Sequence, residues 1–249
     1  MNKELIPIIE VRNLIAKYGE KMILNDISLD IYKGEVTVIL GSSGGGKTTL
    51  MKNIIRLIEP YAGSVKIFGQ EVVDMEEHEF TEVLKRIGML FQNGALLNSI
   101  DIYENISIPL EQHTDLPHDI IKKIIQKKLA LVNLSHAIHL LPSELSGGMK
   151  KRAALARAIA LDPEILFFDE PSAGLDPITS ANLDELILDL KNQLNISLVI
   201  VTHELASIYR VADRIIFLDK GQLIFHGDLQ AVKVCTHPVV RHFFEVGKF

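Results

Sequence analysis

The sequence predicts an α/β fold in which a buried parallel sheet carries helices on its faces. Short β-branched and aliphatic runs alternate along the chain with segments of helical periodicity, as expected when helices connect parallel strands. One of these runs ends in a cluster of glycines immediately before a helical segment. Near the start of the chain, apolar residues alternate with polar ones instead. This pattern predicts antiparallel strands before the parallel core begins.

The composition is that of a folded protein with one large core, or one core and a smaller subdomain. The chain has 249 residues, of which 47% are hydrophobic and 23% charged. Its net charge of -6 argues against a nucleic-acid partner, because such proteins neutralise phosphates with a basic surface. The single cysteine, Cys235, leaves no disulfide within this sequence and fits a reducing compartment. The apolar runs are too short to span a bilayer, so we expect a membrane role only through a partner.

The first elements expected are antiparallel strands between Ile8 and Ile31, with turn signals at Tyr18-Gly19 and Asn25-Asp26. The apolar run that ends in glycines predicts the first parallel strand, and the periodic segment after it predicts a helix. Later apolar runs predict further central strands. These parallel-sheet elements are a strand at Val36–Leu40, a helix at Lys47–Leu57, and strands at Ile165–Phe168, Leu198–Val201 and Ile215–Leu218.

An inserted helical subdomain is predicted in the middle of the chain, over approximately residues 92–160. Strand signals stop between Phe91 and Pro142, and Ile120–Val132 has a helical pattern rich in lysine. We therefore expect a single domain over residues 1–249 that includes this insertion. The tail at residues 231–249 carries Phe243, Phe244 and Phe249, which either pack on their own domain or reach a partner; the first alternative is favoured.

The glycine-rich loop after the first central strand has the sequence Gly-Ser-Ser-Gly-Gly-Gly-Lys-Thr. Glycines allow backbone N–H groups to point at phosphate oxygens, and the following helix adds the positive end of its dipole. Lys47 supplies charge to the β- and γ-phosphates, and the Thr48 hydroxyl is a ligand for Mg²⁺. The pattern favours an ATP site over a flexible Gly/Ser turn. The expected nucleotide-binding residues of this loop are Gly41, Ser42, Gly44, Gly45, Gly46, Lys47, Thr48 and Thr49.

Two adjacent carboxylates follow the apolar run Ile165–Phe168. Because adjacent positions on a strand point to opposite faces, Asp169 and Glu170 are expected to do different work. Asp169 suits Mg²⁺, since hard cations take oxygen ligands. Glu170 is then the residue that polarises the water attacking ATP. The alternative is two acids that end a strand in solvent.

A Ser-Gly-Gly segment lies between these motifs, within Leu145–Met149, at the start of a helix expected from about Gly148 to Ala160. Alone it would be a helix cap, although a helix N-terminus also binds anions. Together with the phosphate loop and the paired carboxylates, this segment resembles the signature of the ABC ATPases. The resemblance covers roughly Ile8–Lys233 and implies a P-loop NTPase core with an N-terminal antiparallel β subdomain and an inserted helical subdomain.

The resemblance also implies dimerisation. In this family the signature, here Ser146, Gly147 and Gly148, faces the γ-phosphate of ATP held by a neighbouring copy, so a head-to-tail homodimer is expected. Asp176 resembles the acid of the D-loop, which crosses the dimer interface, and it is also expected to cap a helix that begins at Pro177.

Three further positions resemble functional residues of the family. Tyr18 corresponds to the aromatic residue that stacks on adenine, with core packing as the alternative. Gln92 corresponds to the Q-loop glutamine, which contacts Mg²⁺ or water and reports to the transport subunits. His203 corresponds to the switch histidine, which contacts the γ-phosphate and holds Glu170 and the water in line. Met149 replaces the usual signature glutamine, and Ser42 replaces a common proline; an active ATPase is still expected.

The cargo is indicated only by a closer resemblance. Met89–Leu97, Pro142–Arg152 and Ala153–Leu161 resemble the ATPases of the Mla (maintenance of lipid asymmetry) and MCE phospholipid transporters. This implies a peripheral location at the cytoplasmic face of the inner membrane, with a multi-spanning permease, an MCE-domain lipid-binding protein and a STAS-domain subunit as partners. Ala95–Leu110 would then receive the permease, with ordinary packing as the alternative. The other reading is an importer ATPase for an amino acid or metal.

Overall fold

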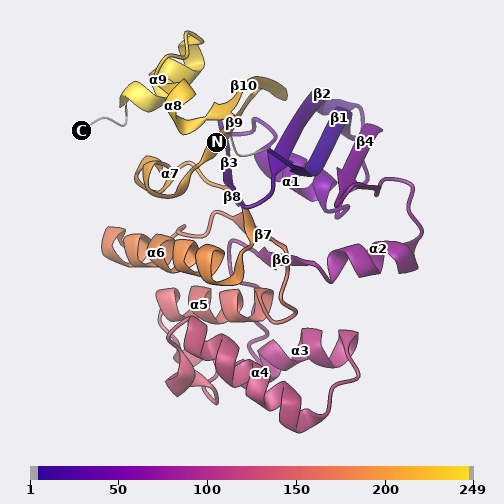
Figure 1. Cartoon of the computed structure of the whole chain (residues 1–249). Coiled ribbons are helices and arrows are strands. Elements are labelled where there is room, and N and C mark those ends of the chain that lie inside the picture. Colours follow the sequence, from indigo (N-terminus) through magenta and orange to yellow (C-terminus); the bar gives the residue numbers. More distant parts are fainter. Residues whose placement is uncertain (1–4, 247–249) are drawn as a thin grey trace. The chain divides into compact units, whose positions relative to one another are not determined.

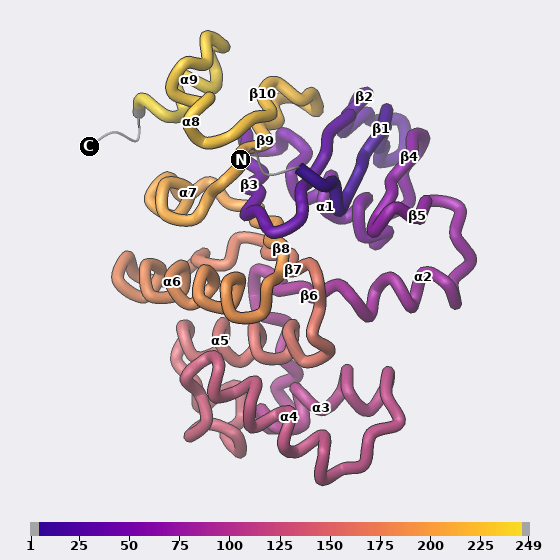
Figure 2. The backbone as a smooth tube through the Cα atoms, in the orientation of Figure 1, coloured from indigo at the N-terminus to yellow at the C-terminus, as the bar shows by residue number. Residues whose placement is uncertain are grey.

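The computed structural model describes residues 5–246 (Figure 1). Internal contacts divide this part of the chain into two compact units. The first unit comprises residues 5–83 and 197–246, and the second comprises residues 84–196. The narrower helical subdomain at residues 92–160 and the separate tail at residues 231–249 stay predictions. The backbone tube follows the chain through each unit (Figure 2).

An antiparallel sheet opens the first unit, as predicted. Its strand order is β2-β1-β4-β5, and each neighbouring pair is antiparallel. The predicted turn at Tyr18-Gly19 is confirmed, because β1 ends at Tyr18 and Gly19 adopts a φ of 56°. The strands of this sheet are β1 (Pro7–Tyr18), β2 (Lys21–Tyr32), β4 (Ala62–Ile67) and β5 (Gln70–Glu71).

The second predicted turn, at Asn25-Asp26, is wrong, because both residues lie inside β2. Leu14 pairs with Ile27 and Ala16 with Leu24, so β2 holds one extra residue between these pairs. Asp26 adopts a φ of 55° and its carboxylate accepts a hydrogen bond from the Asn13 amide at 2.8 Å. The polar pair therefore forms a β-bulge and does not end the strand.

The first unit also carries the parallel strands that position the phosphate loop. β3 (Val36–Gly41) lies between β8 (Ser197–Val201) and β9 (Arg214–Asp219), and it is parallel to both. Every residue of β3 and β8 is buried, which explains their continuous apolar sequences. β10 (Gln222–Asp228) pairs antiparallel with β9.

The helix after β3 is shorter than predicted. α1 (Lys47–Ile54) ends three residues before Leu57, because Arg56 adopts a left-handed backbone with φ of 53°. The other helices described in this unit are α7 (Leu205–Val211), α8 (Leu229–Val232) and α9 (Pro238–Val246), and α2 (Glu77–Leu84) ends where the second unit begins.

Two phenylalanines of the tail pack on the first unit, in line with the favoured alternative. The ring of Phe243 lies 5.3 Å from that of Phe217 on β9, in an edge-to-face arrangement. Phe244 meets Tyr209 of α7 at 5.9 Å. The third aromatic residue of that prediction, Phe249, lies outside the described residues.

The second unit pairs a short parallel sheet with helices. β6 (Ile87–Leu90) and β7 (Ile165–Asp169) run parallel, and Ile165–Phe168 are fully buried. The segment from residue 91 to 142 contains only helical elements, as predicted. Across residues 5–246, no helix combines the length and apolar character needed to cross a membrane. The helices of the second unit are α3 (Ile102–His113), α4 (His118–Leu131), η1 (Ser135–Ala137), η2 (Pro142–Glu144), α5 (Gly147–Ala158) and α6 (Pro177–Leu194).

Candidate active site

The phosphate loop joins β3 to α1 in the first unit. Gly46 caps α1 with a φ of 100°, and a Cβ atom there would lie 2.5 Å from Leu24 Cδ2, so a larger residue would disrupt the loop. Lys47 Nζ donates hydrogen bonds to the carbonyl oxygens of Gly41 and Ser42, both at 3.0 Å. The loop therefore holds its lysine ammonium over its own backbone, next to the N-terminus of α1.

Ser42 has a role that the sequence did not reveal. Its hydroxyl donates a 2.6 Å hydrogen bond to Asp219 Oδ1 at the end of β9. The turn after β9 also holds the loop, because the Gly221 N–H donates to the Gly45 carbonyl oxygen at 3.3 Å. The residue that replaces the common proline thus fastens the phosphate loop to the neighbouring strand.

A cavity of about 290 Å³ opens on this loop. Tyr18, at the end of β1, lines the cavity with half of its surface exposed, as a ring that stacks on a ligand must be. His203 follows β8. Because β8 is parallel to β3 and Val201 pairs with Ile39, His203 lies just beyond the edge of the sheet where the loop begins. The cavity is lined by Tyr18, Lys21, Ile23, Gly44, Gly45, Gly46, Lys47, Thr48 and Thr49.

The second group of predicted residues lies at the carboxyl edge of β6 and β7. β6 ends at Leu90, which pairs with Phe168 of the parallel strand β7, and Gln92 follows that end of β6. Asp169 is the last residue of β7. The structure therefore brings Gln92, Asp169 and Glu170 to one edge of this sheet, although the sequence places them more than seventy residues apart.

The strand-alternation argument does not hold for Glu170, because β7 ends at Asp169. Glu170 adopts a left-handed backbone with φ of 48°, which is uncommon for a residue with a side chain. The direction of its carboxylate is thus set by a turn. Backbone conformations of this kind cluster at functional sites.

The Ser-Gly-Gly segment begins α5. Ser146 is the N-cap, and its hydroxyl accepts a hydrogen bond from the Met149 N–H at 3.3 Å. Ser146 and Gly147 are exposed, and a Cβ atom on Gly148 would lie 2.8 Å from Thr179 Cγ2 at the start of α6. The exposed N-terminus of α5 therefore lies beside that of α6.

The predicted capping role of Asp176 is confirmed. Its side chain accepts hydrogen bonds from the backbone N–H groups of Ile178 and Thr179, at 3.1 and 3.0 Å. The Thr179 hydroxyl donates a further hydrogen bond, which is the largest cause of the lowered pKa of the Asp176 carboxyl. The D-loop role implied by the resemblance stays a prediction.

Lys151 is a residue of this region that the sequence reasoning missed. It is 7% exposed, and its ammonium donates a hydrogen bond to the backbone carbonyl oxygen of Gln92. Burial lowers the pKa of Lys151, while the carboxylates of Asp169 and Glu170 raise it. A signal existed in the sequence, because Lys151 shares a helix face with the buried Ala154 and Leu155, at spacings of three and four residues.

The predicted site residues thus fall into two groups, one in each unit. The phosphate loop and His203, and likewise Gln92, Asp169 and Glu170, follow the carboxyl ends of parallel strands, where ligands bind in open α/β sheets. The first unit holds Tyr18, Gly41, Ser42, Gly44, Gly45, Gly46, Lys47, Thr48, Thr49 and His203, and the second holds Gln92, Ser146, Gly147, Gly148, Asp169, Glu170 and Asp176.

Known proteins resemble this chain over most of its length. Residues 24–173 match the profile of the family described as ABC transporter. The chain is 43% identical to the intermembrane phospholipid transport system ATP-binding protein MlaF of Haemophilus influenzae, over 91% of this chain and 85% of that protein. It is 40% identical to the probable ribonucleotide transport ATP-binding protein mkl of Mycobacterium leprae, over 94% of this chain and 68% of that protein.

A solved structure confirms the fold class. The dimeric, post-hydrolysis state of the ATP-binding cassette MJ0796, bound to ADP and Pi, matches with a TM-score of 0.80 at 30% identity. The match covers 89% of this chain and 98% of that one.

Proposed function

Because the chain belongs to the ABC transporter family and is an ATPase, we propose that it powers a transporter that moves phospholipid between the inner and outer membranes. The similarity to the phospholipid-system protein of Haemophilus influenzae, across nearly the whole chain, carries this proposal. The mycobacterial similarity favours ribonucleotide as the second candidate cargo. An amino-acid or metal importer remains the third.

In the first unit, the phosphate loop binds the phosphates of ATP. Its backbone N–H groups and the Lys47 ammonium supply the positive ends of dipoles and a full charge, which oxygen-rich anions need. Thr49 lines the same cavity. Tyr18 stacks on the adenine, and the half-exposed ring at the cavity rim supports this role. His203 contacts the γ-phosphate.

Glu170, in the second unit, polarises the water that attacks the γ-phosphate. His203, in the first unit, keeps that water in line. Mg²⁺, when bound, neutralises charge on the phosphates. Its proposed ligands are Thr48, Gln92 and Asp169, whose side chains carry the oxygen donors that this cation prefers. Mutating the residues of each group separately tests these roles.

We propose that two copies of the chain act together. The exposed N-terminus of α5, at Ser146, Gly147 and Gly148, is a site for the γ-phosphate held by a second copy. Asp176 lies in the segment that crosses the interface. The dimeric state of the similar ATP-binding cassette supports this assembly.

The membrane partners belong to the proposal as well. A cavity of about 380 Å³ in the second unit is lined mainly by apolar side chains of β6, α3 and α5. Leu97, Ile108 and Pro109 contribute to it, within the segment Ala95–Leu110 that we propose receives the permease. An MCE-domain protein and a STAS-domain subunit complete the proposed complex, at the cytoplasmic face of the inner membrane.

Purification from the native cell tests this function. The tagged chain is extracted from gently solubilised membranes, and its protein and lipid partners are identified by mass spectrometry. A multi-spanning permease with an MCE-domain protein and bound phospholipid is the expected result. A permease with a solute-binding protein and no lipid would overturn the cargo, and the absence of any membrane partner would overturn the transporter role.

A further inference from the structure

The loop that follows β6 is fastened to α5 by two cationic side chains. We name residues 91–95 the Gln92 loop. The buried Lys151 donates a hydrogen bond to the Gln92 carbonyl oxygen. Arg157 donates two more, from Nη2 to the Gly94 carbonyl oxygen and from Nη1 to that of Ala95, both at 2.8 Å. Both cations lie on α5, whose N-cap is Ser146.

The backbone of the Gln92 loop packs directly against α5 between these two attachments. Gly94 has a φ of 72°, and a Cβ atom there would lie 3.2 Å from the Cβ of Ala154, which is 1% exposed. A small residue on each side therefore permits the close approach. Since three backbone carbonyls are held at fixed points, the loop and the helix move together.

Holding a loop with a buried ammonium group is unfavourable in free energy unless the charge has partners. Removing a lysine charge from water costs free energy unless partners compensate, and an apolar side chain would fill the same space at lower cost. The partners here are the Gln92 carbonyl oxygen and the charges of Asp169 and Glu170. The Lys151 ammonium therefore lies at the edge of the sheet that carries the proposed hydrolytic residues.

We propose that Lys151 is a positioning residue for ATP hydrolysis. It acts by fastening the Gln92 loop to α5, beside Asp169 and Glu170. This inference rests on the proposed function of the same edge. Arg157 provides the second attachment. Movement of the N-terminus of α5 is therefore passed to Gln92 through these bonds.

The chain offers a matched control for a merely structural role. Lys128 of α4 is a second buried lysine of the same unit, 5% exposed, and it pairs with Asp162. Lys128→Met removes a buried charge, and its ion pair with the exposed Asp162, without touching the Gln92 loop. It should therefore lower the melting temperature and leave turnover unchanged. Lys151→Met removes both the charge and the hydrogen bond to Gln92.

The experiment uses the full chain purified with its membrane partners, and measures ATP turnover, affinity for a fluorescent ATP analogue, and melting temperature. Lys151→Met should lower kcat about tenfold, the size expected for a lost charged hydrogen bond, with nucleotide affinity nearly unchanged. Lys151→Arg should restore most of the turnover. Lys151→Gln keeps a donor of hydrogen bonds without the charge, and should recover turnover partly.

Three results would overturn the inference: full turnover in Lys151→Met, a loss of turnover in Lys128→Met of the same size, or no rescue by arginine. If Lys151→Met fails to fold, Lys151→Gln and Arg157→Lys give the same comparison, because each should lower kcat with nucleotide affinity kept. A wild-type complex that does not hydrolyse ATP would contradict the proposed function itself, before any variant is compared.

Discussion

Lys47 is the residue on which nucleotide binding depends most. Its ammonium lies over the phosphate loop, so Lys47→Ala removes the only full positive charge that the loop itself carries. We expect affinity for ATP to fall at least about tenfold, as measured by equilibrium binding of a fluorescent analogue. Lys52→Ala on the same helix is the control and should bind normally. Wild-type affinity in Lys47→Ala would contradict the proposed role.

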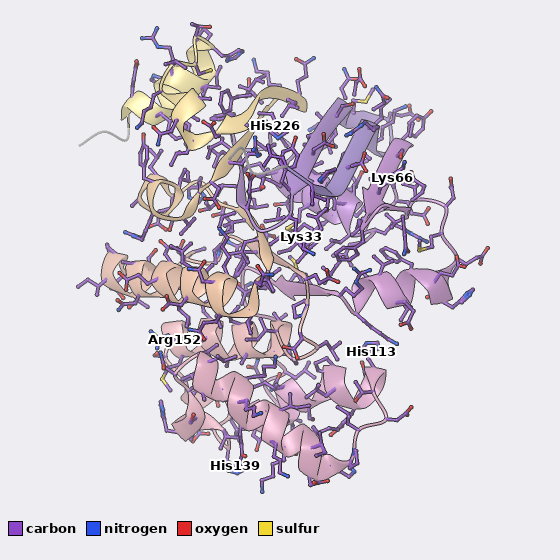
Figure 3. All side chains as sticks on the ribbon, in the orientation of Figure 1. Lys33, Lys66, His113, His139, Arg152 and His226 are labelled. Atoms are coloured by element: carbon purple, nitrogen blue, oxygen red, sulfur yellow. The ribbon has the colours of Figure 1, made fainter. Side chains whose placement is uncertain are left out.

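His226 on β10, labelled in Figure 3, should make the stability of the first unit depend on pH. Its Nε2 atom is buried and, among the described residues, has no hydrogen-bond partner. Burial, and secondarily the charge of Arg214, lower the pKa of His226 from 6.5. Between the lowered pKa and 6.5 the unfolded chain binds more protons than the folded chain does. The contribution of neutral His226 to the free energy of unfolding is therefore fully present above pH 6.5 and is lost as the pH falls through the lowered pKa.

The measurement is the melting temperature of wild type and His226→Phe between pH 7.5 and 5.5. The variant should lose less of its stability on acidification than wild type does. His78→Asn, at an exposed position, should follow wild type. If His226→Phe also follows wild type throughout, the histidine is not the cause.

At the scale of single residues, the sequence predicts the motif residues well, but it predicts poorly the residues that hold them in position. Lys47 and Asp169 were found because a short pattern carries their chemistry. Asp219 and Lys151 were missed, because each acts on a residue that is distant in sequence: Asp219 on Ser42, and Lys151 on the Gln92 carbonyl oxygen. Such pairs are fixed only when strands and helices pack.

At the scale of elements, the close approach of β6 to α5 positions the Gln92 loop. A Cβ atom on Gly88 would lie 2.3 Å from the Ala158 carbonyl oxygen and 2.6 Å from Leu166 Cδ1. Gly88→Ala should therefore force the strand and the helix apart, at a cost of roughly 1–3 kcal/mol. Thermal unfolding should show a fall of several degrees, and an unchanged melting temperature would show that this contact yields easily.

Elements were predictable where one pattern dominated. Continuous apolar runs identified β3, β7, β8 and β9, since strands buried on both faces need no polar positions. β10 was not identified, because it is half-buried along most of its length and its apolar run, Leu223–Phe225, is only three residues long. The bulge at Asn25-Asp26 resembled a turn, because Asn and Asp are typical turn residues. The bulge contacts a distant segment, since the Asn25 N–H donates to the Gly221 carbonyl oxygen.

At the scale of the whole molecule, the cargo was predictable only through resemblance. The nucleotide chemistry follows from residues that are visible in the sequence, since phosphates and Mg²⁺ restrict which side chains can bind them. Cargo does not, because an ATPase subunit does not hold the molecule that its partners transport. Similarity to relatives named for phospholipid and for ribonucleotide transport therefore leaves that question to experiment.

The proposed transporter couples ATP hydrolysis, in which Glu170 polarises the attacking water, to the movement of phospholipid. The purified complex is reconstituted into vesicles with a labelled phospholipid, and lipid transfer is followed with ATP and Mg²⁺, using wild type and Glu170→Gln. We predict ATP-dependent transfer with wild type and none with the variant, because an amide cannot accept the proton of the attacking water. A wild-type complex that hydrolyses ATP without moving phospholipid, or equal transfer by both proteins, would contradict the account.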